Sequence, residues 1–254
     1  MKHHHRYLYR PAPANHPALK NCFLVRVAAP LPPKVDLRSF LLPPRDQGDE
    51  GCCSGFGTAA LRECSRSVAL AKSNAGAAVV KYLSPAYLYA KTRITEGSFP
   101  EDVGATIADE VVTLQTLGVC PESALIYSGQ PGQLPTPKND VQARPFRCGV
   151  PESVDSSDPS NLEAALSGGQ TVVFGMPVYS SFEDVGADGM VPIPGLAEEC
   201  LGGHCMLAVG YDHAAGLLTV RNSWGTDWGV GGHCFIPYAM ISQFAEAWVI
   251  PITP

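Results

Sequence analysis

The sequence has no long apolar run and no cluster of basic residues, and each absence excludes a class of function. No apolar stretch approaches the roughly 18 residues that a membrane-spanning helix needs. The net charge is −6 without a basic cluster, so we expect neither nucleic acid nor a membrane as a partner. The first residues also lack the apolar core of a signal peptide. The localisation nevertheless stays open between cytoplasmic and exported.

The nine cysteines lack the even count and the spacing of a small disulfide framework. We therefore expect most of them to be buried reduced thiols, which pack as small hydrophobic side chains. They also lack the two-residue gaps of zinc sites, so we expect no metal and no other cofactor. The histidines at positions 3–5 could be native or the remnant of a purification tag, and no function is assigned to them.

The chain divides into an extended arm and one folded body. Residues 1–33 carry six prolines between Pro11 and Pro33, and only Cys22–Val27 has the pattern of a short strand. The body, 34–254, is long enough to bury a core of its own. We expect it to act as a monomer.

Helical patterns come first in the body and strand patterns follow. Helices are predicted from Ser54, from the cap at Ser84 and from the cap at Thr106, whereas 128–158 is predicted to be a long loop. After a short helix capped by Ser160, the strands are predicted at 171–178, 205–211, 217–221, 234–237 and 248–252. This order predicts an α+β fold with two subdomains that face each other across a cleft.

The stretch from Arg45 to Phe56 places a thiol where a loop becomes a buried helix. Gly48, Asp49 and Gly51 favour turns, and Phe56 begins an apolar stripe of helical spacing. The unpaired N–H groups of a helix start favour a thiolate. Cys53 is therefore a candidate nucleophile, and its neighbour Cys52 is expected to have no catalytic role.

Two further polar residues lie next to apolar runs, as at the ends of core strands: His204 beside Cys205–Tyr211, and Asn222 after Leu217–Arg221. With Gln47 six positions before Cys53, this set resembles the papain family of cysteine peptidases, in a bacterial type with a short N-terminal prosegment. The resemblance implies a papain-like fold: a helical half (34–150) and a β-barrel half (151–254), with the active-site cleft between them.

The resemblance also implies a role for each residue of the site. Cys53 would attack the substrate carbonyl, His204 would move the proton, and Asn222 would hold the histidine ring. Gln47 would donate to the oxyanion, and Trp224 would keep water away from the pair of His204 and Asn222.

Substrate contacts are implied at small residues on both sides of the cleft. Gly104 and Ala105 would pair with the backbone of an extended peptide, and Gly203 and Met176 would line the neighbouring pocket. The sequence departs from the family at Glu50, where a disulfide cysteine is common, at Cys52, usually serine, and at Ser54, usually tryptophan. None of these departures removes a catalytic group.

The sequence thus predicts a cysteine endopeptidase that acts on polypeptides, with an N-terminal arm that restrains the cleft. Two alternatives stay open. One is an acyltransferase that uses the same three residues with an amine as acceptor, and the other is an inactive homologue that binds peptides. Side-chain preference cannot be read from the sequence, because it depends on loops.

Overall fold

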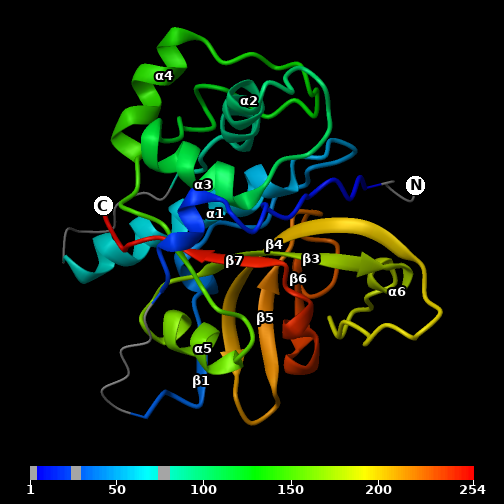
Figure 1. Cartoon of the computed structure of the whole chain (residues 1–254). Coiled ribbons are helices and arrows are strands. Elements are labelled where there is room, and N and C mark those ends of the chain that lie inside the picture. Colours follow the sequence, from blue (N-terminus) through cyan, green and yellow to red (C-terminus); the bar gives the residue numbers. More distant parts are fainter. Residues whose placement is uncertain (1–4, 24–29, 74–80) are drawn as a thin grey trace.

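The helices and strands of the body form two halves, and the N-terminal arm runs between them (Figure 1). The computed structural model describes residues 5–23, 30–73 and 81–254. In Figure 1 the helical half lies above the strands, and short helices lie beside the sheet. The helices are α1 (Cys53–Lys72), α2 (Pro85–Glu96), α3 (Ile107–Thr116), α4 (Pro137–Ala143), α5 (Pro159–Ser167) and α6 (Ser180–Glu183).

The helices begin where capping side chains satisfy their free N–H groups. The hydroxyl of Ser84 accepts the N–H of Tyr87 at the start of α2, and that of Thr106 accepts the N–H of Asp109 at the start of α3. Both starts were predicted from the sequence. None of the helices in the described part of the chain is long and apolar enough to span a membrane.

The half that was predicted as a β-barrel is a seven-stranded antiparallel sheet. Its path is β2-β7-β3-β4-β5-β6, and β1 pairs with the far end of β4. The strands are β1 (Lys34–Asp36), β2 (Glu152–Ser153), β3 (Val172–Tyr179), β4 (Cys200–Asp212), β5 (Leu217–Arg221), β6 (His233–Pro237) and β7 (Glu246–Val249). The long strand β4 is central and touches both β3 and β5.

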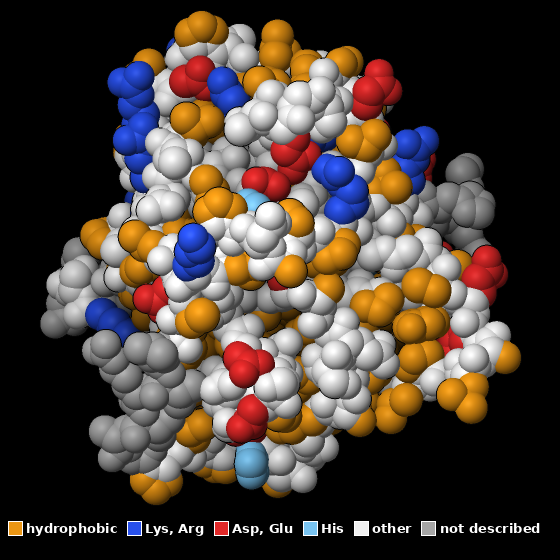
Figure 2. Space-filling view, viewed as in Figure 1, with side chains coloured by type: hydrophobic (Ala, Val, Ile, Leu, Met, Phe, Trp, Pro, Cys, Tyr) orange, Lys and Arg blue, Asp and Glu red, His pale blue; other side chains and the backbone are white. Residues whose placement is uncertain are grey.

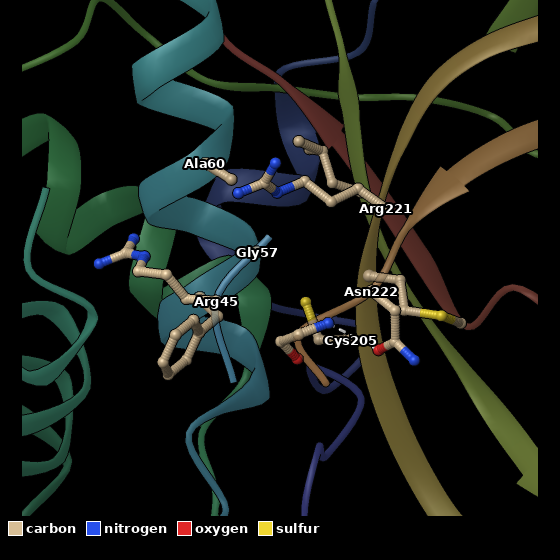
Figure 3. A pocket seen from close by; sticks show the side chains of 10 residues that line it. Arg45, Gly57, Ala60, Cys205, Arg221 and Asn222 are labelled. Carbon is tan, nitrogen blue, oxygen red and sulfur yellow. Dashed lines mark hydrogen bonds between the residues drawn. The ribbon is translucent and has the colours of Figure 1, made fainter. Parts of the chain in front are cut away.

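Helix α1 packs closely against this sheet because it presents a glycine there. A Cβ atom at Gly57 would lie 2.9 Å from Sγ of Cys205 and 3.1 Å from Val173. Figure 3 shows Gly57 and Ala60 of α1 facing Cys205 of β4 and Arg221 of β5 across a small pocket. The close approach brings the start of α1 next to β4.

Several predicted boundaries differ from the structure. The predicted loop 128–158 contains α4, whose first turn is fixed by reciprocal hydrogen bonds between Thr136 and Asn139. The cap of α5 is Asp158 and not Ser160, because Pro159 takes the first helical position. Strand β7 begins two residues before the predicted strand. Of the strand predicted at Cys22–Val27, residues 24–27 lie outside the described part.

The N-terminal arm lies across the junction of the two halves. The N–H of Tyr9 donates to the carbonyl of Gly203 in the sheet at 3.1 Å, and the N–H of Arg10 donates to the carbonyl of Ala105 in the helical half at 3.4 Å. In the space-filling view, the side chains form a continuous surface where the arm crosses, without a deep hollow (Figure 2). The arm therefore fills the place where a cleft was predicted.

Candidate active site

Cys53 is the first residue of α1, where backbone N–H groups have no helical partner. Its side chain has no exposed surface. Burial raises the pKa of the Cys53 thiol to about 12, and backbone hydrogen bonds from Cys205 and Ser54 act in the opposite direction without overcoming it. The helix start thus supplies donors for a thiolate, but the covered site holds the neutral thiol.

Cys52 faces a different part of the molecule. Its Sγ lies 3.7 Å from the carbonyl oxygen of Pro85, at the start of α2, and it packs with Phe56 and Tyr89. Cys53 instead packs with residues of the arm and of β4. The two adjacent thiols are therefore separated by the geometry of the helix start.

His204 and Asn222 form a buried pair that fixes the tautomer of the histidine. The backbone N–H of Ser223 donates to Oδ1 of Asn222 at 2.8 Å, which identifies this atom as the amide oxygen. Nε2 of His204 lies 2.8 Å from the same oxygen, so Nε2 must carry the proton and donate. In the neutral ring Nδ1 is then a free base, and it has no hydrogen-bond partner among the described residues.

Aromatic rings cover this pair. Trp224 stacks on His204 with ring centres 5.1 Å apart, and Phe182 approaches Trp224 edge-on at 5.4 Å. His204 is 1% exposed, and this burial lowers its pKa to about 4. In the structure, with the arm across the site, both the thiol and the imidazole are therefore neutral at pH 7.

Gln47 is fixed in orientation by hydrogen bonds at both ends of its side chain. Its Oε1 accepts the hydroxyl of Ser223 at 2.5 Å, and one N–H of Nε2 donates to the carbonyl of Glu50 at 2.9 Å. The amide nitrogen carries a second N–H. A buried side chain with a spare donor is suited to bind an oxyanion.

The residues predicted to bind substrate contact the arm, with one exception. A Cβ atom at Gly104 would lie 1.7 Å from the carbonyl oxygen of Leu8, and Ala105 and Gly203 accept N–H groups of the arm. Met176 is buried in the core of the sheet with Phe182. Successive residues of a strand face opposite sides, so its neighbour Gly175 faces the arm instead.

The arm brings further residues to the site that sequence reasoning missed. Tyr7 lies edge-on to His204 with ring centres 6.0 Å apart, and its hydroxyl donates to Glu183 at 2.7 Å. The ring of His5 stacks on Trp224 at 4.3 Å. The aromatic residues of the arm were the available signal, although nothing in the sequence indicated where they would pack.

Two departures from the family have visible structural partners. Ser54 donates to Oε1 of Glu110 at 2.9 Å, and both side chains are fully buried. Burial raises the pKa of Glu110 to about 8. Glu50 lies 3.8 Å from the guanidinium of Arg93. All nine cysteines are free thiols, seven of them buried.

The fold and the site agree with a known class of enzyme. A model of the papain family of cysteine proteases matches residues 31–245. The chain therefore belongs to the papain family of cysteine proteases, which are hydrolases.

Among known structures, the chain is similar to xylellain, a cysteine protease from Xylella fastidiosa, with 29% identity and a TM-score of 0.85 over 100% of this chain and 98% of that one. Digestive procathepsin L 3 of Tenebrio molitor shares the fold, with a TM-score of 0.70 and 19% identity over 98% of this chain and 76% of that one. Among curated proteins, pro-cathepsin H of Bos taurus is 28% identical over 91% of this chain and 67% of its own length. An uncharacterized peptidase C1-like protein of Acanthamoeba polyphaga mimivirus is 26% identical over 89% of this chain and 78% of its own length.

Proposed function

We propose that the protein is a cysteine endopeptidase that cleaves extended polypeptides through Cys53, His204 and Asn222, and that its N-terminal arm restrains the cleft. The observation that best supports the site is the hydrogen bond between His204 and Asn222. Because of this bond, Nδ1 is the free base of the neutral ring. The next residue of the strand, Cys205, donates its backbone N–H to the Cys53 thiol. A thiol, a correctly protonated imidazole and an orienting amide are the parts of acyl transfer.

The proposed reaction uses each of these groups in turn. Nδ1 of His204 takes the proton of Cys53, and the sulfur forms a bond to the substrate carbonyl carbon. The carbonyl oxygen becomes an oxyanion, which accepts the spare N–H of Gln47 and the backbone N–H of Cys53. The imidazolium then protonates the leaving amine as the C–N bond breaks, which leaves a thioester. Water, deprotonated by His204, hydrolyses the thioester and restores the thiol.

Restraint by the arm is supported by its contacts and by the protonation of the site. Residues 5–10 contact Trp224, His204 and the small residues predicted to bind substrate. The site under the arm holds a neutral thiol and a neutral imidazole, because burial disfavours both charges. Once the arm is displaced, water reaches both groups, which favours the ion pair.

The test combines labelling with product analysis. We expect an epoxysuccinyl inhibitor to label Cys53 once per chain, and peptides to be cleaved at internal bonds. The same reactions with an added amine measure transfer: hydrolysis that persists as the main route supports a peptidase, whereas amide products in place of acids indicate an acyltransferase. A chain that binds peptides but neither reacts with the inhibitor nor cleaves them refutes the proposal.

A further inference from the structure

A second thiol lies next to the sulfur of Cys53. Cys205 follows His204 in β4, and its backbone N–H donates to Sγ of Cys53. Its own side chain is 1% exposed and belongs to the same apolar cluster as Cys53. Peptide hydrolysis through Cys53, His204 and Asn222 has no use for the sulfur of Cys205. Its place beside the nucleophile therefore needs another explanation.

The sulfur of Cys205 faces helix α1, on the side of the helix that carries Cys53. A Cβ atom at Gly57 would lie 2.9 Å from Sγ of Cys205, and Figure 3 shows Cys205 facing Gly57. Gly57 comes four residues after Cys53, and residues four apart lie on one face of a helix. Successive residues of a strand face opposite sides, so Cys205 can face the helix while His204 binds Asn222.

The contact between Cys205 and Cys53 places the two residues within reach of a disulfide. A disulfide holds its two Cβ atoms about 3.5–4.5 Å apart. The backbone nitrogen of Cys205 already donates to Sγ of Cys53, and a single atom, Cα, separates this nitrogen from Cβ of Cys205. Rotation of the two side chains therefore brings the sulfur atoms together with little movement of the backbone.

Cys52 is adjacent to Cys53 in the chain but does not share this arrangement. Its Sγ lies 3.7 Å from the carbonyl oxygen of Pro85, and a Cβ atom at Gly55 would lie 2.9 Å from it. It packs in a different cluster from Cys53 and Cys205. Cys52 is thus a matched control, because it is an equally buried thiol that faces another part of the molecule.

We propose that Cys205 is a resolving cysteine, which converts a peroxide-oxidised Cys53 into a reversible disulfide. The inference rests on the proposed function, because the oxidation begins with the same thiolate that would attack a substrate. That thiolate forms when the arm is displaced, so the open enzyme is the form that becomes oxidised. The disulfide keeps the enzyme inactive, and a small thiol recovers it.

The chemistry takes two balanced steps. The Cys53 thiolate attacks one oxygen of hydrogen peroxide and the O–O bond breaks. The other oxygen leaves as hydroxide and takes a proton from the His204 imidazolium to become water. The sulfur has then lost two electrons and is a sulfenic acid. The Cys205 thiol next forms an S–S bond to Cys53 as the S–OH bond breaks, and the hydroxyl leaves with the thiol proton as a second water.

Reduction follows the reverse order with two equivalents of a small thiol. The first equivalent attacks the disulfide and forms a mixed disulfide with one of the two cysteines. The second equivalent releases that cysteine and leaves as the oxidised small molecule. Both Cys53 and Cys205 are then thiols again.

The surroundings assign different tasks to the two thiols. Burial under the arm raises the pKa of Cys53 to about 12, but backbone N–H groups of Cys205 and Ser54 act against this rise. At Cys205, burial raises the pKa well above its ordinary value, and charge on Cys53 acts in the same direction. Cys53 is therefore the thiol that reacts with the oxidant, and Cys205 stays reduced until a sulfenic acid forms beside it.

The test exposes the full chain to hydrogen peroxide and follows peptide hydrolysis together with the covalent state. Samples blocked with iodoacetamide under denaturing conditions and digested without reduction should contain a peptide pair that joins Cys53 to Cys205. Dithiothreitol should then restore most of the initial hydrolysis. The same series with Tyr9→Ala, which weakens the hold of the arm, should form the disulfide severalfold faster.

Cys205→Ser removes the resolving thiol by the change of one atom. The sulfenic acid at Cys53 then persists, and further peroxide takes it to sulfinic and sulfonic acids, which dithiothreitol does not reduce. We expect the recovered fraction, relative to each chain's own activity before oxidation, to fall at least about fivefold. The matched variant Cys52→Ser should recover as the native chain does.

Over-oxidation of Cys53 in the native chain without a link to Cys205 would overturn the inference. Loss of recovery in Cys52→Ser and not in Cys205→Ser would do the same. The linked peptides are read from the native chain, so this outcome does not depend on whether a variant folds. If Cys53 reacted with neither peroxide nor iodoacetamide in the Tyr9→Ala chain, the proposed function itself would be wrong, and the resolving role would fall with it.

Discussion

At the scale of single residues, the two adjacent thiols differ in their surroundings and so in their expected importance. Cys53 packs beside Cys205 and the arm, whereas Sγ of Cys52 lies against the carbonyl of Pro85. We expect Cys53→Ala to abolish peptide hydrolysis, because the nucleophile is lost. Cys52→Ser should keep kcat/KM within about fivefold, since it removes a packing contact away from the reacting atoms.

These two variants test the register of the site, and circular dichroism of both checks that they are folded. If the Cys52→Ser chain were inactive and the Cys53→Ala chain active, Cys52 would be the nucleophile. The role of Gln47, which rests on its offset of six residues from Cys53, would then lose its basis.

The tautomer of His204 gives a second prediction at this scale. Asn222→Ala removes the acceptor that keeps the proton on Nε2, so the ring can also adopt the unproductive tautomer. We expect kcat to fall on the order of tenfold to a hundredfold, part of what acid–base catalysis contributes. Labelling of Cys53 should persist, because the thiol itself is intact.

Loss of labelling together with turnover would indicate that Asn222 holds the fold and not the ring. A melting curve of the Asn222→Ala chain separates the two explanations.

Glu110 allows a prediction about pH. Its pKa in the folded chain is about 8, raised by burial above the ordinary 4.5. Between these values the folded state holds a proton that the unfolded state has released, so this group makes the free energy of unfolding fall as pH rises from 4.5 to 8. Glu110→Gln keeps an acceptor for Ser54 but cannot ionise. We expect its urea midpoint, relative to that of the native chain, to increase between pH 5 and pH 8.5.

The native chain and the Glu110→Gln chain share all their other titrating groups, so the effects of those groups cancel in the difference between the two urea midpoints. His204 and His233 have pKa values lowered to about 4 by burial. Their contribution to the free energy of unfolding therefore increases as pH rises towards 6.5, opposite to that of Glu110. A pH-independent difference between the midpoints would show that Glu110 ionises normally.

At the scale of helices and strands, the sequence predicts correctly the boundaries that depend on residues close by in the chain. The caps at Ser84 and Thr106 place α2 and α3 correctly, because a hydroxyl that accepts an N–H marks a helix start whatever lies nearby. Helix α4 was missed because prolines and glycines surround the cap at Thr136. The start of β7 at Glu246 was missed for another reason: a charged residue in a buried strand is explained only by its partners from distant segments.

The same distinction applies to the candidate site. Spacing along the chain was enough to propose Cys53, His204 and Asn222, because each lies next to a recognisable sequence pattern, although in the structure His204 lies inside β4 and not at its start. Cys205 could not be proposed as a neighbour of Cys53, since that contact depends on how closely α1 packs against β4. Sequence periodicity does not determine which helices and strands become neighbours.

The arm gives the prediction that belongs to this scale. Deleting residues 1–30 should expose the cleft, because the contacts of Tyr7, Tyr9 and Arg10 with the body are lost. We expect peptide hydrolysis and alkylation of Cys53 to become at least about tenfold faster, which corresponds to roughly 1.4 kcal/mol of restraint.

The deletion is informative if the shortened chain keeps its melting transition and its near-ultraviolet circular dichroism. Unchanged rates in such a chain would leave the arm without a regulatory role.

At the scale of the whole molecule, the two halves meet along a junction, and the N-terminal arm, which belongs to neither half, fills it. The arm hydrogen-bonds to Ala105 on one side and to Gly203 on the other, and we expect these contacts to stabilise the relative position of the two halves. Its charged contacts, from Arg6 to Asp102 and from Arg10 to Glu96, are largely solvent-exposed on the arginine side. Exposed pairs contribute little, which leaves the buried Tyr9 and the half-buried Tyr7 as the main attachment.

Attachment in the same chain would also decide how the proposed restraint responds to concentration. A tethered segment competes with substrate at an effective concentration on the order of millimolar, however dilute the protein is. If a substrate binds only molecules in which the arm has left the cleft, its apparent Kd is the intrinsic Kd divided by the fraction of such open molecules. Dilution therefore leaves the closed population unchanged. A single cut between the arm and the body would make closure bimolecular, and dilution would then drive the two pieces apart.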